Sequence, residues 1–417
     1  MSKIFISLLT LLLSLTSCGG SKRIKGLTEF TPRLVASSDK SVHLGDSLAI
    51  DVFGNENNFL QNMGHSLKLR PINAKNYKKI KISNNKITAL PSIADGTIYA
   101  FDESAQLVSV DINSGKYNWK ASLDSAKKRL TSSNLVYYQN KLYLIGDLQL
   151  FEIEAKTGKE VTRKSLKDLV RSQPVIRTNA IFIQNVSNNL TAYNTDTWTP
   201  AWSYETWSET LASHNVSSPL IYGNLIISNY TTGQIVANNI SDGAELWQIN
   251  LYKESSSDLA SSPQNATCQP ILLDKYLYVA SNNGYLVKID VTTSRIIWQK
   301  PYQDIVSMSL SGDTIFLTNN ARQIAAISSE DGGVIWASDL INPKESKKDK
   351  IKPSIFLTPV VSEGNVILLS KGGEAFIFDA LNGVMIKYFE IPKNIISFGV
   401  DRESLILFDR YTGYMIN

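Results

Sequence analysis

The chain has 417 residues, of which 43% are hydrophobic, 9% aromatic and 19% charged, the balance of an ordinary globular protein. Its formal net charge of +4 is a small excess spread along the sequence, which gives no reason to expect nucleic-acid binding. The length alone would fit two or three separate domains.

Residues 1–17 are expected to be a signal peptide outside the fold. Lys3 supplies a minimal basic start, and the apolar run 4–15 is too short to span a bilayer. The run ends at Leu15-Thr16-Ser17-Cys18, which resembles a bacterial lipobox in which Cys18 carries lipid and begins the mature chain. The alternative is an ordinary secretory signal with an incidental cysteine. By analogy with enteric bacteria, Gly19 after the cysteine favours the outer membrane.

The second cysteine, Cys268, is expected to be a buried small side chain. If Cys18 is lipidated, Cys268 has no partner in the chain and an intramolecular disulfide is impossible. A nucleophilic role for Cys268 is the less favoured alternative, because the three histidines show no local pairing with it.

Residues 18–60 are interpreted as a lipidated tether and 61–417 as the folded body. The stretch 19–45 is polar, bears glycine and serine, and lacks clear periodicity. Strand-like stretches follow, including one with apolar residues at Ile80 and Ile82 among lysines.

One sequence unit recurs along the rest of the chain. Its first copy, LVSVDINSGKYNW at 107–119, combines an alternating strand, a polar turn residue, a glycine and a tryptophan that begins the next strand. Later copies lie at 150–162, 190–202, 235–247, 286–298, 324–336, 375–387 and 405–417. The spacing is roughly 43 residues per unit, within the range of four-stranded propeller repeats.

The turn position is always polar and able to accept a hydrogen bond. It is occupied by Asp111, Glu154, Asn194, Asn239, Asp290, Ser328, Asp379 and Asp409. The tryptophans Trp119, Trp202, Trp247, Trp298 and Trp336 share one repeat position, which indicates packing between neighbouring units. Thr162 and Lys387 replace the tryptophan in two copies, which predicts weaker packing there.

These repeats predict an all-β fold, an eight-bladed β-propeller of four-stranded antiparallel blades. The eighth copy ends at Asn417, where its tryptophan would come, so an N-terminal strand should complete the last blade and remove its open edge. We assign this closing strand to the stretch from Leu67 to Ile72.

The repeat resembles the propeller unit named after pyrroloquinoline quinone enzymes. Quinoprotein dehydrogenases hold the quinone over the central channel with a metal and an Asp base, often against a disulfide of adjacent cysteines. This chain has no adjacent cysteine pair and no insertion that would form a cofactor lid. The lipobox, short tether and eight compact blades instead resemble the BamB family, lipoproteins of the outer-membrane β-barrel assembly machinery. That resemblance implies no enzymatic activity, no cofactor and no metal site.

In the BamB family, loops that join adjacent blades bind the barrel protein BamA. The corresponding stretch here is 203–219, in which Leu211 falls on an apolar contact position and His214 falls where the family has an arginine. Trp207 is the one tryptophan of this stretch outside the repeat register, and an exposed loop aromatic suits an interface anchor. Packing of Trp207 against its own blade is an equally good interpretation. The next loop, 252–269, would flank this site.

The resemblance therefore implies a lipid-anchored scaffold on the periplasmic face of the outer membrane, with a BamA-like protein as partner and unfolded outer-membrane proteins as a second class of partner. A lysine-rich loop at 342–354 is either a solvated loop or a contact for anionic lipid or an acidic partner. A quinone-dependent dehydrogenase and a general envelope protein-binding propeller are the two alternatives.

Overall fold

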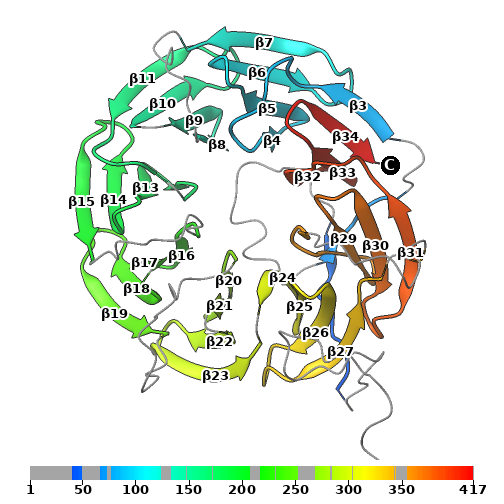
Figure 1. Ribbon diagram of the computed structural model, residues 1–417. Helices are drawn as coiled ribbons and strands as arrows, with labels where there is room; N and C mark the ends of the chain where they lie inside the picture. The colour runs from blue at the N-terminus through cyan, green and yellow to red at the C-terminus, as the bar shows by residue number, and fades with distance from the viewer. Residues whose placement is uncertain are drawn as a thin grey trace, which may run out of the picture.

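The computed structural model describes residues 40–48, 66–72, 77–123, 133–206 (except 147 and 171), 217–251 (except 231), 268–341 (except 282, 283 and 303), 343 and 355–416. Every regular element in these ranges is a β-strand. The strands form eight sheets arranged as a closed ring around a central axis (Figure 1). The prediction of an all-β, eight-bladed propeller is confirmed. In the part of the chain described here, no helix is present that could cross a membrane.

We number the sheets as blades 1 to 8 along the chain. In each blade the first strand lies nearest the axis and the fourth forms the rim (Figure 1). Blades 1 to 4 consist of β4 (Ser92–Ala94), β5 (Thr97–Phe101), β6 (Gln106–Asp111) and β7 (Tyr117–Ser122); β8 (Ser133–Tyr138), β9 (Lys141–Gly146), β10 (Gln149–Glu154) and β11 (Glu160–Ser165); β12 (Val175–Arg177), β13 (Ala180–Gln184), β14 (Asn189–Asn194) and β15 (Pro200–Glu205); and β16 (Leu220–Tyr222), β17 (Leu225–Asn229), β18 (Gln234–Asn239) and β19 (Glu245–Asn250).

Blades 5 to 8 continue the ring. They consist of β20 (Ile271–Leu273), β21 (Tyr276–Ser281), β22 (Tyr285–Asp290) and β23 (Arg295–Pro301); β24 (Ile305–Ser311), β25 (Thr314–Asn319), β26 (Gln323–Ser328) and β27 (Val334–Asp339); β28 (Val360–Ser362), β29 (Asn365–Leu369), β30 (Glu374–Asp379) and β31 (Met385–Glu390); and β32 (Ser397–Asp401), β33 (Ser404–Phe408), β34 (Thr412–Ile416) and β3 (Tyr77–Lys81). Two short N-terminal strands, β1 (Ser47–Leu48) and β2 (Ser66–Leu67), add to the inner edge of blade 7.

The turn between the third and fourth strands is held by its first polar residue, as the sequence predicts. Asp290 Oδ1 accepts hydrogen bonds from the backbone N–H groups of Thr292 and Thr293, at 2.9 and 3.2 Å. Asp379 makes the same pair of bonds in blade 7. The side chain thus satisfies amides that would otherwise be unpaired in the turn, which explains why the position is always polar.

The tryptophans join neighbouring blades, which confirms their predicted role. Each indole Nε1 donates to the carbonyl oxygen that follows the turn residue of the next blade. The acceptors are Ala155 for Trp119, Ile240 for Trp202, Val291 for Trp247, Ser329 for Trp298 and Ala380 for Trp336, at 2.8–3.1 Å. Four of these rings also lie against the turn glycine of the next blade, where a side chain would collide with the indole.

Other groups fill the two junctions at which the repeat lacks tryptophan, in place of the weaker packing that the sequence predicts. Opposite Thr162, Trp198 occupies the position of the turn glycine in blade 3, and its indole donates to the Glu152 carboxylate of blade 2 at 2.9 Å. Opposite Lys387, the N-terminal chain enters the junction, and Lys387 Nζ donates to the carbonyl of Ile72 at 3.1 Å.

The closing strand is β3, so the assignment of Leu67 to Ile72 to this role is wrong. β3 pairs antiparallel with β34, from Tyr77 opposite Ile416 to Lys81 opposite Thr412. Lys78 then takes the place of the tryptophan, because its Nζ donates to Ile112 O of blade 1 at 3.2 Å. Leu67 instead pairs in parallel with Ser362, and it packs with Leu69 and Ile72 in the core between blades 7 and 8.

The register of the eighth repeat copy also needs correction. Residues 405–417 match the third and fourth strands of the other copies in spacing, but in the structure they contribute β33 and β34, the second and third strands. Gly413 therefore lies within β34, and the fourth strand is β3.

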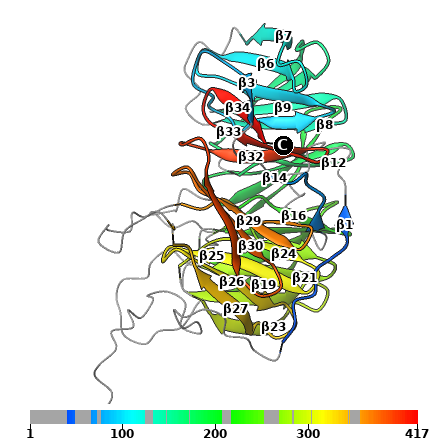
Figure 2. The same cartoon turned by 90° about the vertical axis from the view of Figure 1, so that its right-hand side faces the viewer.

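The N-terminal residues 40–48 and 66–72, which we call the strap, lie across one face of blades 6, 7 and 8. Residues 40–48 fall within the predicted tether, yet Lys40 forms an ion pair with Asp331 and His43 O accepts the N–H of Asp313 in blade 6. Farther along, Arg70 N donates to Glu403 O of blade 8 at 2.8 Å. Figure 2 shows the blue segment with β1 running along this side of the disc.

Candidate partner-binding surface

The strand order gives the disc two different faces. The tight turns between the first and second strands, and between the third and fourth, lie on the turn face that carries the strap. The opposite, loop face holds the connections from each blade to the next. The predicted partner residues Trp207, Leu211 and His214 belong to one such connection and lie outside the described residues, as do Cys18 and the lysines of 342–354.

The two ends of the 207–216 connection are described and are held firmly on the loop face. Before it, Thr206 Oγ1 donates to Gln234 Oε1 of blade 4 at 2.9 Å. After it, Ser217 Oγ accepts a bond from Asn229 Nδ2 at 3.1 Å. Each end is therefore tied to blade 4, whose first strand the connection precedes.

The next connection is tied to the same place by a two-way hydrogen bond. Ser218 N donates to Gln269 Oε1 at 2.8 Å, and Gln269 Nε2 donates to Ser218 O at 3.0 Å. The ends of 207–216 and 252–267 are thus neighbours on blades 4 and 5, which fits the expectation that the second loop flanks the first. Cys268, beside Gln269, is half-buried against the core of blades 5 and 6 and is not in a disulfide.

An aromatic pair supports the strand that leads into this surface. The ring of Tyr204 lies 6.3 Å from that of Tyr230, and the Tyr204 hydroxyl donates to Glu245 Oε2 of blade 4 at 2.6 Å. Burial raises the pKa of Tyr204, and the hydrogen bond to Glu245 raises it further. Tyr204 therefore stays a neutral donor throughout the physiological pH range.

A chain of polar contacts continues from this site around the ring. Gln184 Nε2 of blade 3 donates to the carbonyl of Asn229 in blade 4 at 2.8 Å, and Ser172 Oγ donates to the carbonyl of Gln184 at 3.3 Å. We call the residues Ser172, Gln184, Asn229, Ser217, Ser218 and Gln269 the polar belt. Sequence reasoning missed the belt, because its side chains meet only when the blades stand side by side, although Gln184 and Asn229 share one repeat position and Ser218 and Gln269 another.

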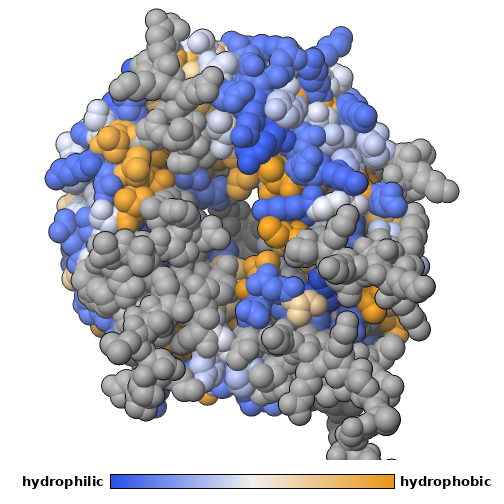
Figure 3. Space-filling view, viewed as in Figure 1, coloured by the Kyte–Doolittle hydropathy of each residue, from blue (hydrophilic) through white to orange (hydrophobic). Residues whose placement is uncertain are grey.

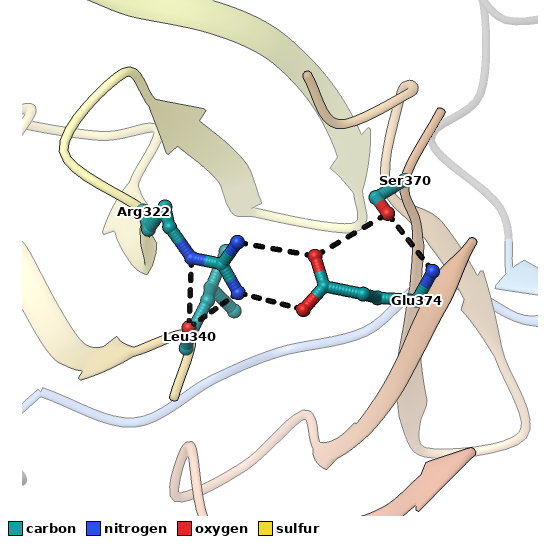
Figure 4. A network of polar contacts seen from close by, with 4 residues as sticks. All are labelled: Arg322, Leu340, Ser370 and Glu374. Carbon is teal, nitrogen blue, oxygen red and sulfur yellow. Dashed lines mark hydrogen bonds and ion pairs between the residues drawn. The ribbon is translucent and has the colours of Figure 1, made fainter. Parts of the chain in front are cut away.

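An ion pair joins blades 6 and 7 on the same face of the disc. Arg322 and Glu374 form a bidentate pair, with Nη2 to Oε1 at 2.9 Å and Nη1 to Oε2 at 3.1 Å (Figure 4). Arg322 also donates from Nε and Nη2 to the carbonyl of Leu340, at 3.2 and 3.0 Å. Leu340 ends the chain of blade 6 just before 342–354, so this pair fixes one end of the lysine-rich connection.

Among the residues that the structure describes, the centre of the disc does not offer those of a quinoprotein site. Figure 3 shows a hollow at the axis, bordered by hydrophobic as well as hydrophilic residues. Within the ranges that the structure describes, no three His, Cys, Asp or Glu side chains are grouped so that they could hold a metal ion. The sequence contains two cysteines, at 18 and 268, so the vicinal disulfide of quinoprotein dehydrogenases cannot form. The residues present therefore do not fit a bound quinone with its metal.

Comparison with solved structures places this fold near proteins of several kinds, including BamB and quinohemoprotein dehydrogenases. BamB of Moraxella catarrhalis superposes with a TM-score of 0.66 at 15% identity, over 82% of this chain and 100% of that one. The quinohemoprotein alcohol dehydrogenase of Comamonas testosteroni gives the same TM-score at 12% identity, over 88% of this chain and 81% of that one. At these identities the likeness shows the fold alone.

Sequence comparison finds relatives of the BamB kind. An uncharacterized protein of Rickettsia conorii is 30% identical over 97% of this chain and 96% of its own length. The outer membrane protein assembly factor BamB of Shewanella oneidensis is 22% identical over 60% of this chain and 67% of its own length. The family described as outer membrane protein assembly factor BamB matches residues 132–338. The chain therefore belongs to the BamB family of β-propellers.

Proposed function

We propose that this protein is a non-enzymatic scaffold of the outer-membrane β-barrel assembly machinery, anchored by lipid on Cys18 at the periplasmic face of the outer membrane. Its loop face, centred on Trp207, Leu211 and His214, binds a BamA-like barrel protein. Family membership together with the fixed ends of the 207–216 connection supports this proposal.

The carrying observation is the pairing of Ser218 with Gln269. Two hydrogen bonds hold the ends of consecutive inter-blade connections together, so the surface presented by 203–219 and 252–269 has a rigid base. Binding to a surface with a rigid base costs less conformational entropy than binding to two independent loops.

Unfolded outer-membrane proteins are the second class of partner, and the rim offers them strand edges. The outermost strands β23 and β31 expose apolar side chains next to their free edges, including Ile296, Ile297, Met385 and Ile386. An extended segment with alternating apolar residues can add to such an edge through main-chain hydrogen bonds.

The fold likeness to a quinohemoprotein dehydrogenase keeps an enzyme as a second candidate. The absence of a metal-binding group within the described residues and of a second cysteine next to Cys268 argues against it. Dye reduction by purified protein supplied with pyrroloquinoline quinone and calcium would favour the enzyme. A pull-down from membranes that returns other envelope proteins without the barrel protein would favour a general binding propeller.

Photocrosslinking in native membranes tests the scaffold proposal. A photoreactive residue at Trp207 is expected to crosslink to the barrel protein, whereas one at the exposed Asn113 on the turn face is not. In parallel, the Trp207→Ala/Leu211→Asp variant is expected to lose co-purification with the barrel protein.

The thermal unfolding of that variant should match the parent protein, because both substitutions lie in a connection between blades. Equal crosslinking from Trp207 and Asn113, or full co-purification of the variant, would contradict this assignment of the surface. Absence of palmitate or other acyl label at Cys18 would contradict the anchor separately.

A further inference from the structure

The rim of the disc carries most of its basic residues on three consecutive blades. The outer strands of blades 8, 1 and 2 are β3 (YKKIK), β7 (YNWKAS) and β11 (EVTRKS), which together hold six basic residues and one acidic residue. The outer strands of blades 3, 4 and 6 each hold one acidic residue and no basic one. The outer strand of blade 5 holds two basic residues and no acidic one, and that of blade 7 holds one of each. These three basic strands adjoin one another around the upper rim in Figure 1.

Four of these cations are free to act on a partner. Lys78 turns inward to the carbonyl of Ile112, and Arg163 is neutralised by Glu160 at 2.8 Å. We call the remaining residues, Lys79, Lys81, Lys120 and Lys164, the basic arc. In the described part of the chain none of the four forms an ion pair.

Two members of the basic arc lie over tyrosine rings. Lys120 Nζ lies 3.5 Å from the ring centroid of Tyr117, and Lys79 Nζ lies 5.9 Å from that of Tyr77. A ring face attracts an ammonium group without cancelling its charge, so each lysine is held in place and keeps its field. Hydrophilic residues gather over this part of the disc in Figure 3.

Protection of strand edges does not explain this distribution. Lysines on an outer strand block unwanted pairing with other strands, and they are most needed where the edge is apolar. The most apolar edge, β31, exposes Met385 and Ile386, yet its one lysine, Lys387, is bonded to Ile72 O. Edge protection does account for Arg295 and Lys300, which flank the exposed Ile296 and Ile297 on β23. The lysines of the basic arc lie instead on β3, β7 and β11, strands with mostly polar side chains.

We propose that the basic arc binds an acidic, extended and flexible polypeptide segment that follows the rim across blades 8, 1 and 2. Charge complementarity selects the partner, since four lysines that form no ion pair create a positive potential along the arc. The curvature of the rim favours a flexible chain over a bilayer. A flat membrane touches a convex rim at about one blade, whereas a flexible segment reaches lysines on all three. This proposal does not rest on the scaffold function.

The test uses the full-length protein and a fluorescein-labelled peptide of Glu, Gly and Ser, with a Gln, Gly and Ser peptide as the neutral probe. Fluorescence anisotropy is expected to show binding of the acidic peptide only, with a loss of affinity of about tenfold or more between 0.05 and 0.3 M NaCl. The variant Lys79→Gln/Lys81→Gln/Lys120→Gln is expected to bind at least about tenfold more weakly at 0.05 M NaCl.

The control variant Arg295→Gln/Lys300→Gln/Lys371→Gln removes the same charge from blades 5 and 7 and is expected to bind like the parent. Equal weakening in both variants would show that only net charge matters and would overturn the proposal. Absence of acidic-peptide binding, or equal binding of the neutral peptide, would overturn it as well. So would flotation with phosphatidylglycerol vesicles that the arc variant loses while peptide binding stays unchanged, because that result assigns the arc to a membrane.

Discussion

The contact between each tryptophan and the next blade can be tested with two glycines that differ in one respect. Gly383 and Gly115 occupy equivalent turns, with φ of 70° and 69°. A Cβ at Gly383 would lie 2.4 Å from Cε3 of Trp336, whereas a Cβ at Gly115 meets nothing within 4 Å. Gly115 is open because the preceding blade ends in β3, which places Lys78 where other blades have tryptophan.

Substitution by alanine separates backbone strain from the clash. Gly115→Ala forces a Cβ into the left-handed region and is expected to cost about 1–2 kcal/mol. Gly383→Ala carries the same strain and also pushes the buried indole from its site, which is expected to add about 1–3 kcal/mol. The free energies of unfolding, measured by urea denaturation with intrinsic fluorescence, should differ by that added amount.

A double-mutant cycle identifies the indole as the cause. Trp336→Leu alone is expected to destabilise the protein by about 3–5 kcal/mol, because it empties a buried site and leaves Ala380 O unpaired. In the Trp336→Leu background, Gly383→Ala should cost no more than Gly115→Ala does in the parent protein. Equal losses for the two single glycine variants would refute the inter-blade packing derived from the structure.

Three further results are expected. Arg322→Met leaves the Glu374 carboxylate buried without its partner, so the free energy of unfolding in urea should fall by about 3–5 kcal/mol. Arg322→Met/Glu374→Gln should recover most of this loss, because Gln occupies the same repeat position in blades 1, 2, 4 and 6. A chain that begins at Tyr77 keeps β3 and should remain soluble, with a lower free energy of unfolding than the parent. A chain that begins at Ser83 lacks β3 and should be insoluble on expression. Equal solubility of the two chains would contradict closure by β3. The hydrogen bond from Lys40 lowers the pKa of Asp331 from 3.8 to about 2. The parent should therefore exceed Asp331→Asn in stability by its full amount above about pH 4, and this difference should disappear as the pH falls through about 2. A stability difference that persists at lower pH would contradict the role of this ion pair.

The repeat could be predicted from the sequence because each copy satisfies local rules. A polar residue accepts the turn amides, a glycine adopts positive φ, and a tryptophan reaches the next blade, so the pattern is visible without any neighbour. The eighth copy is assigned to the wrong strands from sequence, because the turn between its second and third strands also begins with an aspartate that accepts hydrogen bonds from the turn amides. Asp409 Oδ1 accepts hydrogen bonds from the backbone N–H groups of Tyr411 and Thr412, and Asp379 Oδ1 likewise accepts from the second and third residues after it.

The closing strand could not be chosen from local pattern, because both N-terminal candidates bury alternate residues. Leu67 and Leu69 are buried between blades, and Ile80 is buried in blade 8. What distinguishes them is the partner, β34 in one case and β28 in the other, and that choice depends on residues more than 290 positions away in the chain. The polar belt could not be predicted for a different reason, because its side chains contact one another mainly across blade junctions.

The strap covers part of the turn face and so limits the surfaces that a partner protein can reach. It crosses the turn face of blades 6, 7 and 8, bonds to turns in blades 6 and 8 and to Ser362 at the end of β28 in blade 7, and places β2 on the inner edge of blade 7. A protein that docked there would first have to displace the chain's own contacts, including the burial of Leu67, Leu69 and Ile72. The loop face of blades 3 to 5 and the basic arc on the rim of blades 8, 1 and 2 carry no such cover from residues 40–48 and 66–72. A partner therefore gains more from these two surfaces, and because they face different directions, a partner on the loop face and an acidic segment on the rim can be bound together.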